Sequence, residues 1–129
     1  MRRIVYISTA TGMPAAEVDR IVAAAEQGNF ERQITGFLIY NGRNFLQLIE
    51  GEQAVLMSLM AKLARDPRHS GILRLIDEPI SERSCAGWSM HRMRLGSDLA
   101  GRRAAIAAEL PEMMSPGSRQ LVENFAALN

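Results

Sequence analysis

The stretch ITGFLIYNGRNFLQLIEG, residues 34–51, decides the fold. Asn41 and Gly42 divide it into two largely apolar runs, and Asn-Gly is the usual pair of a two-residue type I′ turn. The stretch therefore predicts a β-hairpin whose register is fixed by that turn. Gln47 lies in the middle of the second strand, where an unpaired buried amide would cost roughly 1–3 kcal/mol. We expect Gln47 to be bonded to another residue or to a bound ligand.

Outward from this hairpin, the spacing of apolar residues predicts further strands and two helices. The expected strands are Arg2–Ser8, Ile34–Tyr40, Arg43–Gly51, Ile72–Asp77 and Cys85–Arg94. The apolar face of the first helix is Val18, Ile21, Val22 and Ala25. The face of the second is Val55, Leu56, Leu59, Met60 and Leu63. Gly28 and Asn29 are expected to stop the first helix, and Asp66 with Pro67 the second.

The last part of the chain predicts two short helices. Asp98 can cap a helix that runs to Leu110, and Ser115 before Pro116 is an N-cap signal for a helix to about Leu128. Such short amphipathic helices are unstable alone. We therefore divide the chain into a domain of residues 1–95 and a helical extension of residues 96–129, and expect the extension to cover a bare sheet face or a subunit interface.

The order βαββαββ indicates an α+β fold of ferredoxin-like type, with a five-stranded mixed sheet and two helices on one face. In that arrangement the first and third strands are neighbours. Tyr6 lies in the middle of the first strand and Gln47 in the middle of the third. A phenol and an amide are thus expected to share one buried site under the two helices.

Composition limits the possible functions. The 129 residues are 47% hydrophobic and 22% charged, with a net charge of +1, so charge gives no general attraction to nucleic acid or to acidic membranes. No run of 18 apolar residues and no signal-peptide pattern is present, and we expect a soluble, cytoplasmic protein. One cysteine and two histidines provide neither an intrachain disulfide nor a metal site.

Familiar nucleotide and catalytic motifs are missing. No Gly-x-Gly-x-x-Gly opens a helix after the first strand, and no phosphate loop ends in Gly-Lys-Ser or Gly-Lys-Thr. No nucleophile stands with a positioned base, which weakens an acylphosphatase-like reading of the same fold class. A nucleotide-like cofactor would have to be held by side chains.

A set of residues in order along the chain resembles the BLUF domain, the bacterial sensor of blue light using flavin. These residues are Tyr6, Ser8, Asn29, Ile34-Thr35-Gly36, Phe45, Gln47, Glu50-Gly51, Asp66, Arg68-His69 and Trp88-Ser89-Met90. The resemblance covers roughly residues 2–95 and implies a non-covalently bound FAD whose ring lies between the two helices. FMN or riboflavin is expected to substitute, because the adenine end would lie near solvent.

The resemblance also implies roles for single residues. Tyr6 would give an electron and a proton to the excited flavin, and Gln47 would link Tyr6 to the flavin N5 and O4 edge. Asn29 would bond the pyrimidine edge, with Ile21 also in contact with the cofactor. Arg68 and His69 would lie along the ribityl and phosphate side. The residues Trp88 and Met90 would exchange places near Gln47 as the signal passes on.

Four positions depart from the family pattern. Gly28 stands where a second polar residue is common, Ala24 and Ala25 where a serine is common, and Cys85 where an aromatic residue is usual. One ring-edge contact would therefore be missing, and room would be left beside Trp88. We expect altered recovery kinetics rather than lost flavin binding.

The main reading is a photoreceptor without enzyme activity that signals to a separate protein, such as a cyclic-nucleotide enzyme or a transcriptional regulator. We expect a homo-oligomer that contacts neither nucleic acid nor membrane. Two alternatives stay open. Steady-state reduction by NADH would favour a flavin-dependent oxidoreductase, and a colourless protein that ignores added flavin would favour an interaction module of the same fold. Taken alone, Tyr6 and Gln47 could also be ordinary structural residues.

Overall fold

A five-stranded sheet forms the centre of the computed structural model, which describes residues 1–128. Its strands are β1 (Arg2–Thr9), β2 (Thr35–Tyr40), β3 (Asn44–Gly51), β4 (Ser70–Pro79) and β5 (His91–Met93). The strand order is β4-β1-β3-β2-β5, with antiparallel neighbours except for the parallel pair β2 and β5. This mixed sheet confirms the ferredoxin-like class and the adjacency of the first and third strands.

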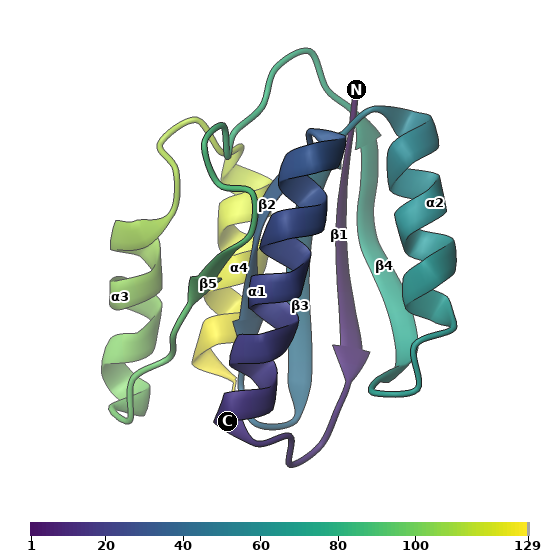
Figure 1. The fold of residues 1–129 in the computed structure, drawn as a ribbon. Coiled ribbons are helices and arrows are strands. Elements are labelled where there is room, and N and C mark those ends of the chain that lie inside the picture. Colours follow the sequence, from purple (N-terminus) through teal and green to yellow (C-terminus); the bar gives the residue numbers. More distant parts are fainter. Residues whose placement is uncertain (129) are drawn as a thin grey trace.

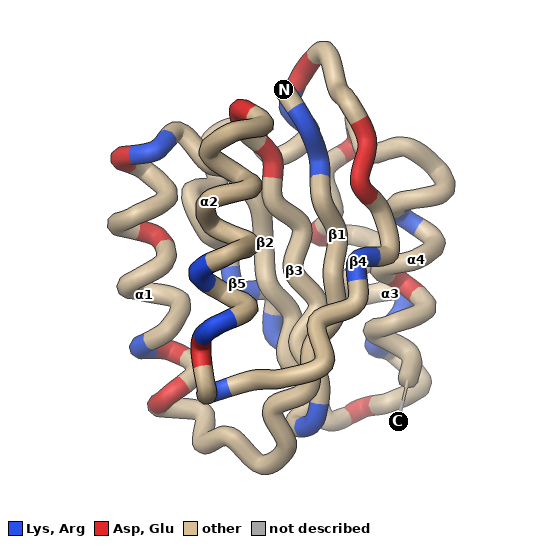
Figure 2. Tube along the Cα trace, turned by 90° about the vertical axis from the view of Figure 1, so that its right-hand side faces the viewer, with Lys and Arg blue, Asp and Glu red and all other residues tan. Residues whose placement is uncertain are grey.

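Helices cover both faces of the sheet (Figure 1). They are α1 (Ala15–Arg32), α2 (Gln53–Ala64), a 3-10 turn (Leu99–Gly101), α3 (Arg102–Glu109) and α4 (Pro116–Ala127). Figure 2 shows α1 and α2 on one side of the sheet, and α3 and α4 on the other. No helix within residues 1–128 is both long and apolar enough to cross a membrane.

Alternation along the strands creates two apolar cores. Ile4 and Tyr6 on β1 belong to the core under α1 and α2, whereas Val5 between them belongs to the core on the opposite face. In that second core, Ile106 of α3 and Phe125 of α4 are buried together with the sheet residues. The tail helices thus cover the bare sheet face, as the sequence predicts.

The hairpin forms as expected, but its turn is not type I′. Tyr40 pairs with Phe45, and residues 41–43 connect β2 to β3. A type I′ turn needs positive φ at both central residues, and only Gly42 has it, at 89°. Instead, the Asn41 side-chain oxygen accepts hydrogen bonds from the backbone N–H groups of Arg43 (3.0 Å) and Asn44 (2.7 Å). This side-chain capping favours the longer loop.

The first helix continues past its expected stop. α1 runs through Gly28 and Asn29 to Arg32, and Gln33 ends it with a left-handed φ of 57°. A glycine inside a helix costs only about 1 kcal/mol. The buried Asn29 side chain donates a hydrogen bond of 2.8 Å to the Ser89 carbonyl, a tertiary contact that favours the helical conformation at this point.

The fifth strand is shorter than predicted and covers only His91–Met93. The preceding segment is held by the buried Glu50 carboxylate instead of by strand pairing. Glu50 accepts hydrogen bonds from the backbone N–H groups of Ser84 and Cys85, both 2.9 Å, and forms an ion pair with Arg3 at 3.1 Å. Because these bonds occupy the backbone at the start of the segment, regular strand pairing with β2 begins only at His91.

The tail helices start differently from each other. Asp98 makes no side-chain cap, contrary to the prediction, and a 3-10 turn precedes α3. Ser115 does cap α4, because its side chain accepts a hydrogen bond from the Ser118 backbone N–H, with Pro116 in the first turn. The second N-cap prediction is therefore confirmed.

Candidate functional site

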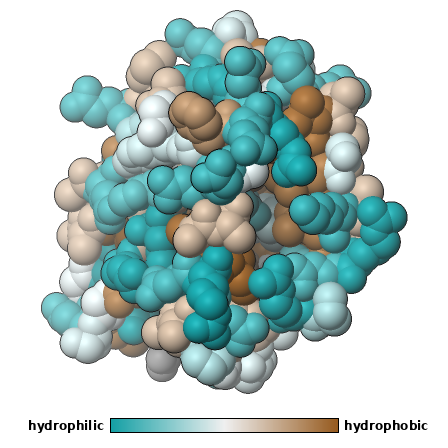
Figure 3. Space-filling view, in the orientation of Figure 1, coloured by the Kyte–Doolittle hydropathy of each residue, from teal (hydrophilic) through white to brown (hydrophobic). Residues whose placement is uncertain are grey.

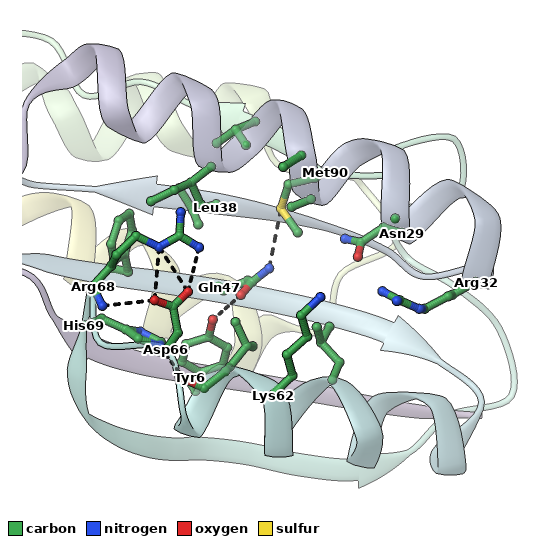
Figure 4. A pocket seen from close by; sticks show the side chains of 18 residues that line it. Tyr6, Asn29, Arg32, Leu38, Gln47, Lys62, Asp66, Arg68, His69 and Met90 are labelled. Atoms are coloured by element: carbon green, nitrogen blue, oxygen red, sulfur yellow. Dashed lines mark hydrogen bonds and ion pairs between the residues drawn. The ribbon is translucent and has the colours of Figure 1, made fainter.

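A cavity of about 240 Å³ lies between α1 and α2, above β1 and β3 (Figure 4). Its lining includes all six residues that the resemblance implies as flavin contacts: Tyr6, Ile21, Asn29, Gln47, Arg68 and His69. Apolar side chains from both helices complete the walls. In Figure 3, apolar side chains lie among polar ones on the right of this face, over the region between α1 and α2.

Tyr6 and Gln47 meet on the floor of the cavity. They are directly opposed in the β1–β3 register, and both side chains are buried. The Tyr6 hydroxyl donates a hydrogen bond to the Gln47 side-chain oxygen Oε1. The expectation that Gln47 is bonded to another residue is thereby confirmed.

The other end of the Gln47 amide is less well satisfied. Its Nε2 lies 3.6 Å from the Met90 sulfur, and a thioether is only a weak hydrogen-bond acceptor. A primary amide has two N–H donors. Gln47 can therefore donate to a stronger acceptor placed in the cavity.

Burial keeps the Tyr6 phenol protonated. Removal from water, with a smaller contribution from the negative charge of Asp66, raises the pKa of Tyr6 well above its usual value of 10.0. The phenol is therefore neutral over the physiological pH range. It can lose its proton only when a strong driving force accompanies the transfer.

Asn29 connects the cavity to the segment before β5. Its Nδ2 donates to the Ser89 carbonyl, and the Gly36 N–H on β2 donates to the Trp88 carbonyl at 2.8 Å. Met90 follows directly and is buried in the cavity wall. Residues 88–90 are thus held between α1 and β2 while one of their side chains touches Gln47.

Arg68 and His69 line the far end of the cavity and already have partners. Arg68 forms an ion pair of 2.6 Å with Asp66, and its hydrogen bonds lower the pKa of Asp66 to about 2. His69 Nε2 lies 2.7 Å from the Leu63 carbonyl, which can only accept, so this nitrogen carries the hydrogen. His69 Nδ1 then accepts from the Ser8 hydroxyl at 2.8 Å.

Trp88 lies on the other side of the sheet from the cavity. It packs edge to face on Phe37, with ring centres 6.3 Å apart, and stacks near His91 at 4.4 Å. His91 in turn lies 2.6 Å from the Glu109 carboxylate on α3. Of the two residues expected to relay a signal, Met90 therefore lies at the site and Trp88 beside the tail core.

The departures from the family pattern have clear positions. Ala24, Ala25 and Gly28 line the cavity with small surfaces, so Asn29 is the buried polar contact that α1 provides. Cys85 is outside the cavity, in the tail core. Burial raises the pKa of Cys85 to about 12, which makes this thiol unreactive.

Two cavity residues, Arg32 and Lys62, escaped the sequence analysis. Helical spacing could have revealed both. Arg32 follows Asn29 by three residues on α1, and Lys62 follows Leu59 by three on α2, so each shares a helix face with a cavity residue. Within residues 1–128, no cluster of histidine, cysteine and acidic side chains could hold a metal ion.

Comparison with known proteins identifies relatives. Residues 1–91 match the family model of sensors of blue light using FAD. The blue light- and temperature-regulated antirepressor BluF of Escherichia coli is 30% identical over 84 residues, which are 64% of this chain and 21% of that protein. The photoactivated adenylate cyclase subunit beta of Euglena longa is 34% identical over 89 residues, which are 67% of this chain and 10% of the cyclase subunit.

Solved structures share the fold. The dark-state structure of BlrB, a BLUF protein, superposes with a TM-score of 0.75 at 32% identity and covers 98% of this chain and 95% of its own. Klebsiella pneumoniae BlrP1 with FMN and cyclic diGMP gives a TM-score of 0.84 at 25% identity, covering 98% of this chain but 34% of that protein. The chain therefore spans only a small part of several of its relatives.

Proposed function

The chain belongs to the family of blue-light sensors that use FAD, and from this premise we propose that the cavity between α1 and α2 holds the flavin ring against Tyr6 and Gln47. The observation that carries the proposal is the buried Tyr6–Gln47 hydrogen bond, with the opposite end of the Gln47 amide facing only the Met90 sulfur. A carbonyl or ring nitrogen of a ligand would give that amide a better partner.

The donor set of the cavity fits a flavin. Ile21, Val22 and Leu59 provide apolar walls for the ring. The Gln47 N–H groups suit acceptors on its polar edge. The side-chain oxygen of Asn29 has no hydrogen-bond partner among residues 1–128 and suits a ring N–H. The cavity thus has apolar walls for the flavin ring and polar side chains for its polar edge.

The chemistry follows from the states of the two residues. When bound, the flavin supplies the absorption of blue light and, once excited, takes up one electron and one proton. Tyr6 can give up both, because its hydroxyl hydrogen already points to Gln47 and both side chains are buried. Loss of that hydrogen frees the Gln47 side-chain oxygen, and the amide rotates or tautomerises. Return of the electron and proton restores Tyr6 and leaves the Gln47 hydrogen bonds rearranged.

We propose that residues 88–90 transmit the change in the Gln47 hydrogen bonds from the cavity to the tail helices. A changed Gln47 amide alters its contact with Met90, and the same short segment carries Trp88, which packs beside the tail core. His91, next in the chain, contacts Glu109 on α3. Residues 1–95 would thus act as the sensor and residues 96–129 as its output element.

The partner is proposed from the resemblance. We infer a sensor without catalysis that acts on a separate protein and assembles with other copies of itself. The relatives are called an antirepressor and an adenylate cyclase subunit, so a transcriptional regulator or a cyclic-nucleotide enzyme is the class of partner we propose.

Absorption spectra in darkness and after blue light test the function. We expect a yellow protein whose blue band shifts slightly to the red and returns in darkness. The shift would report a changed hydrogen bond to the flavin, because no covalent bond between the flavin and the protein is made or lost. A protein that stays colourless with added flavin, or one whose flavin only bleaches in light, would contradict the proposal.

A further inference from the structure

The two ends of the cavity differ in their charge. At one end, Arg68 is neutralised by Asp66 in an ion pair of 2.6 Å. At the other end, Arg32 and Lys62 reach toward each other from α1 and α2 (Figure 4). Neither of these two side chains forms an ion pair within residues 1–128. The unneutralised positive charge of the cavity is therefore at the Arg32 and Lys62 end.

A groove of about 370 Å³ continues from this end. It shares Arg32, Leu59 and Lys62 with the cavity, so the two spaces are contiguous. Its remaining lining comes from the first two turns of α2: Ala54, Val55 and Ser58. The groove thus offers a mostly apolar surface with one hydroxyl, directly beyond two cations.

Gly28 lies close to the end of the Arg32 side chain. A Cβ atom at residue 28 would stand 3.3 Å from the Arg32 guanidinium nitrogen Nη1, closer than most side-chain contacts. A side chain at this position would require the flexible end of Arg32 to shift by a few tenths of an ångström. Gly28 thus leaves room for the Arg32 guanidinium at this end of the cavity.

We propose that Arg32 and Lys62 bind the diphosphate of FAD and that the groove of Ala54, Val55 and Ser58 binds its adenosine. The inference rests on the proposed function, because it takes the flavin ring to lie in the cavity. Guanidinium and ammonium groups are the usual partners of phosphate oxygens. The apolar groove suits the face of adenine, and Ser58 suits its polar edge.

This placement differs from the sequence-based expectation. Arg68 and His69 were expected on the phosphate side, but the first is paired with Asp66 and the second uses both ring nitrogens within the protein. Binding phosphate there would require those bonds to break. The adenine end also gains a binding surface, so FAD should bind more tightly than FMN, and FMN more tightly than riboflavin.

The role of Arg32 and Lys62 is tested by the dissociation constants of FAD, FMN and riboflavin. These constants are measured by fluorescence with the flavin-depleted chain of 129 residues. Arg32→Gln and Lys62→Gln should each weaken FAD and FMN roughly three- to tenfold, as expected for a charged hydrogen bond near solvent, and leave riboflavin unchanged. Raising the salt concentration should weaken FAD and FMN alone. The matched controls Arg20→Gln on α1 and Arg65→Gln, directly after α2, remove the same charge outside both spaces and should change nothing.

Ser58→Trp tests the groove. The residue is exposed on α2, so the fold should tolerate the indole, which would fill the adenosine site. The affinity for FAD should fall to that for FMN, with FMN itself unaffected. Equal affinities of all three flavins in the original chain, or an unchanged FAD affinity in Arg32→Gln and Lys62→Gln, would overturn this inference. Neither result would contradict the proposed function. That function is contradicted instead if riboflavin binds but light produces no red shift.

Discussion

Gln47 and Tyr6 form the smallest unit on which the proposed function depends. Gln47→Leu keeps nearly the same volume but removes the amide, and Tyr6→Phe removes the hydroxyl while the ring still packs. Each variant loses the buried Tyr6–Gln47 hydrogen bond, a loss of about 1–3 kcal/mol of folding stability. We expect both to fold and bind flavin, and both to lose the reversible red shift in light-minus-dark spectra.

The second tyrosine provides the matched control for this prediction. The Tyr40 hydroxyl donates to the Ala10 carbonyl and accepts from the Met13 N–H, outside the cavity. Tyr40→Phe should therefore keep the red shift. A normal red shift in Gln47→Leu would mean that the buried amide is only structural.

The protonation of Tyr6 predicts a dependence of stability on alkaline pH. Its pKa is higher in the folded chain than the usual value of 10.0, so the folded state holds the proton more tightly than the unfolded state does. This contribution to stability is complete below pH 10.0 and decreases as the pH rises above it. Urea midpoints from neutral pH to about pH 11 should therefore fall more steeply for the original chain than for Tyr6→Phe. Parallel curves would contradict this assignment.

At the scale of elements, the segment of residues 88–90 has contacts on both sides of the sheet, one at the cavity and one at the tail core. Met90 contacts Gln47, whereas Trp88 contacts Phe37 and His91 on the tail side. Trp88→Phe should keep the size of the red shift, because no cavity contact changes, and alter its lifetime in darkness. Recovery kinetics after a light pulse give the measurement. Loss of the shift itself would place Trp88 in the primary event instead of downstream of it.

Sequence patterns predicted the order of elements well and their ends less well. The ferredoxin-like order and the mid-strand positions of Tyr6 and Gln47 were sufficient to bring the two residues to one site on neighbouring strands, and the structure shows that they are directly opposed. The end of α1 was wrong, since a tertiary bond of Asn29 outweighs the local effect of Gly28. The fifth strand was too long because distant hydrogen bonds to Glu50 occupy its expected beginning.

Some cavity residues could be predicted from the sequence and others could not. Tyr6 and Gln47 stand out because polar groups are rare in buried strands, and the resemblance supplied Asn29 and Arg68. Lys62 and Arg32 are exposed cations on helix surfaces, where such residues are common and carry no signal of their own. Helical spacing could have placed each on the same face as a cavity residue, but only the approach of α1 to α2 in three dimensions brings the two cations to one end of the cavity.

At the scale of the whole molecule, the tail helices are part of the fold. Ile106, Val122 and Phe125 are buried against the sheet face opposite the cavity, and each large apolar side chain contributes roughly 1.5–3 kcal/mol when buried. A chain that ends at Leu95 should therefore expose this face, unfold at lower urea concentration and associate in solution. Urea titration and size-exclusion chromatography measure both effects. A truncated chain with unchanged stability, assembly and recovery rate would show that the tail is neither a structural cover nor an output element.

The sheet separates the core under the cavity from the core under the tail helices, so the sequences on its two sides can change independently. Within residues 1–128, the cavity lining ends at Met90, so no side chain of α3 or α4 touches the place where light would be absorbed. Substitutions on the outer surface of these helices can therefore accumulate without disturbing the photochemistry. The surface that a partner protein would contact can thus change in sequence while the cavity residues stay the same.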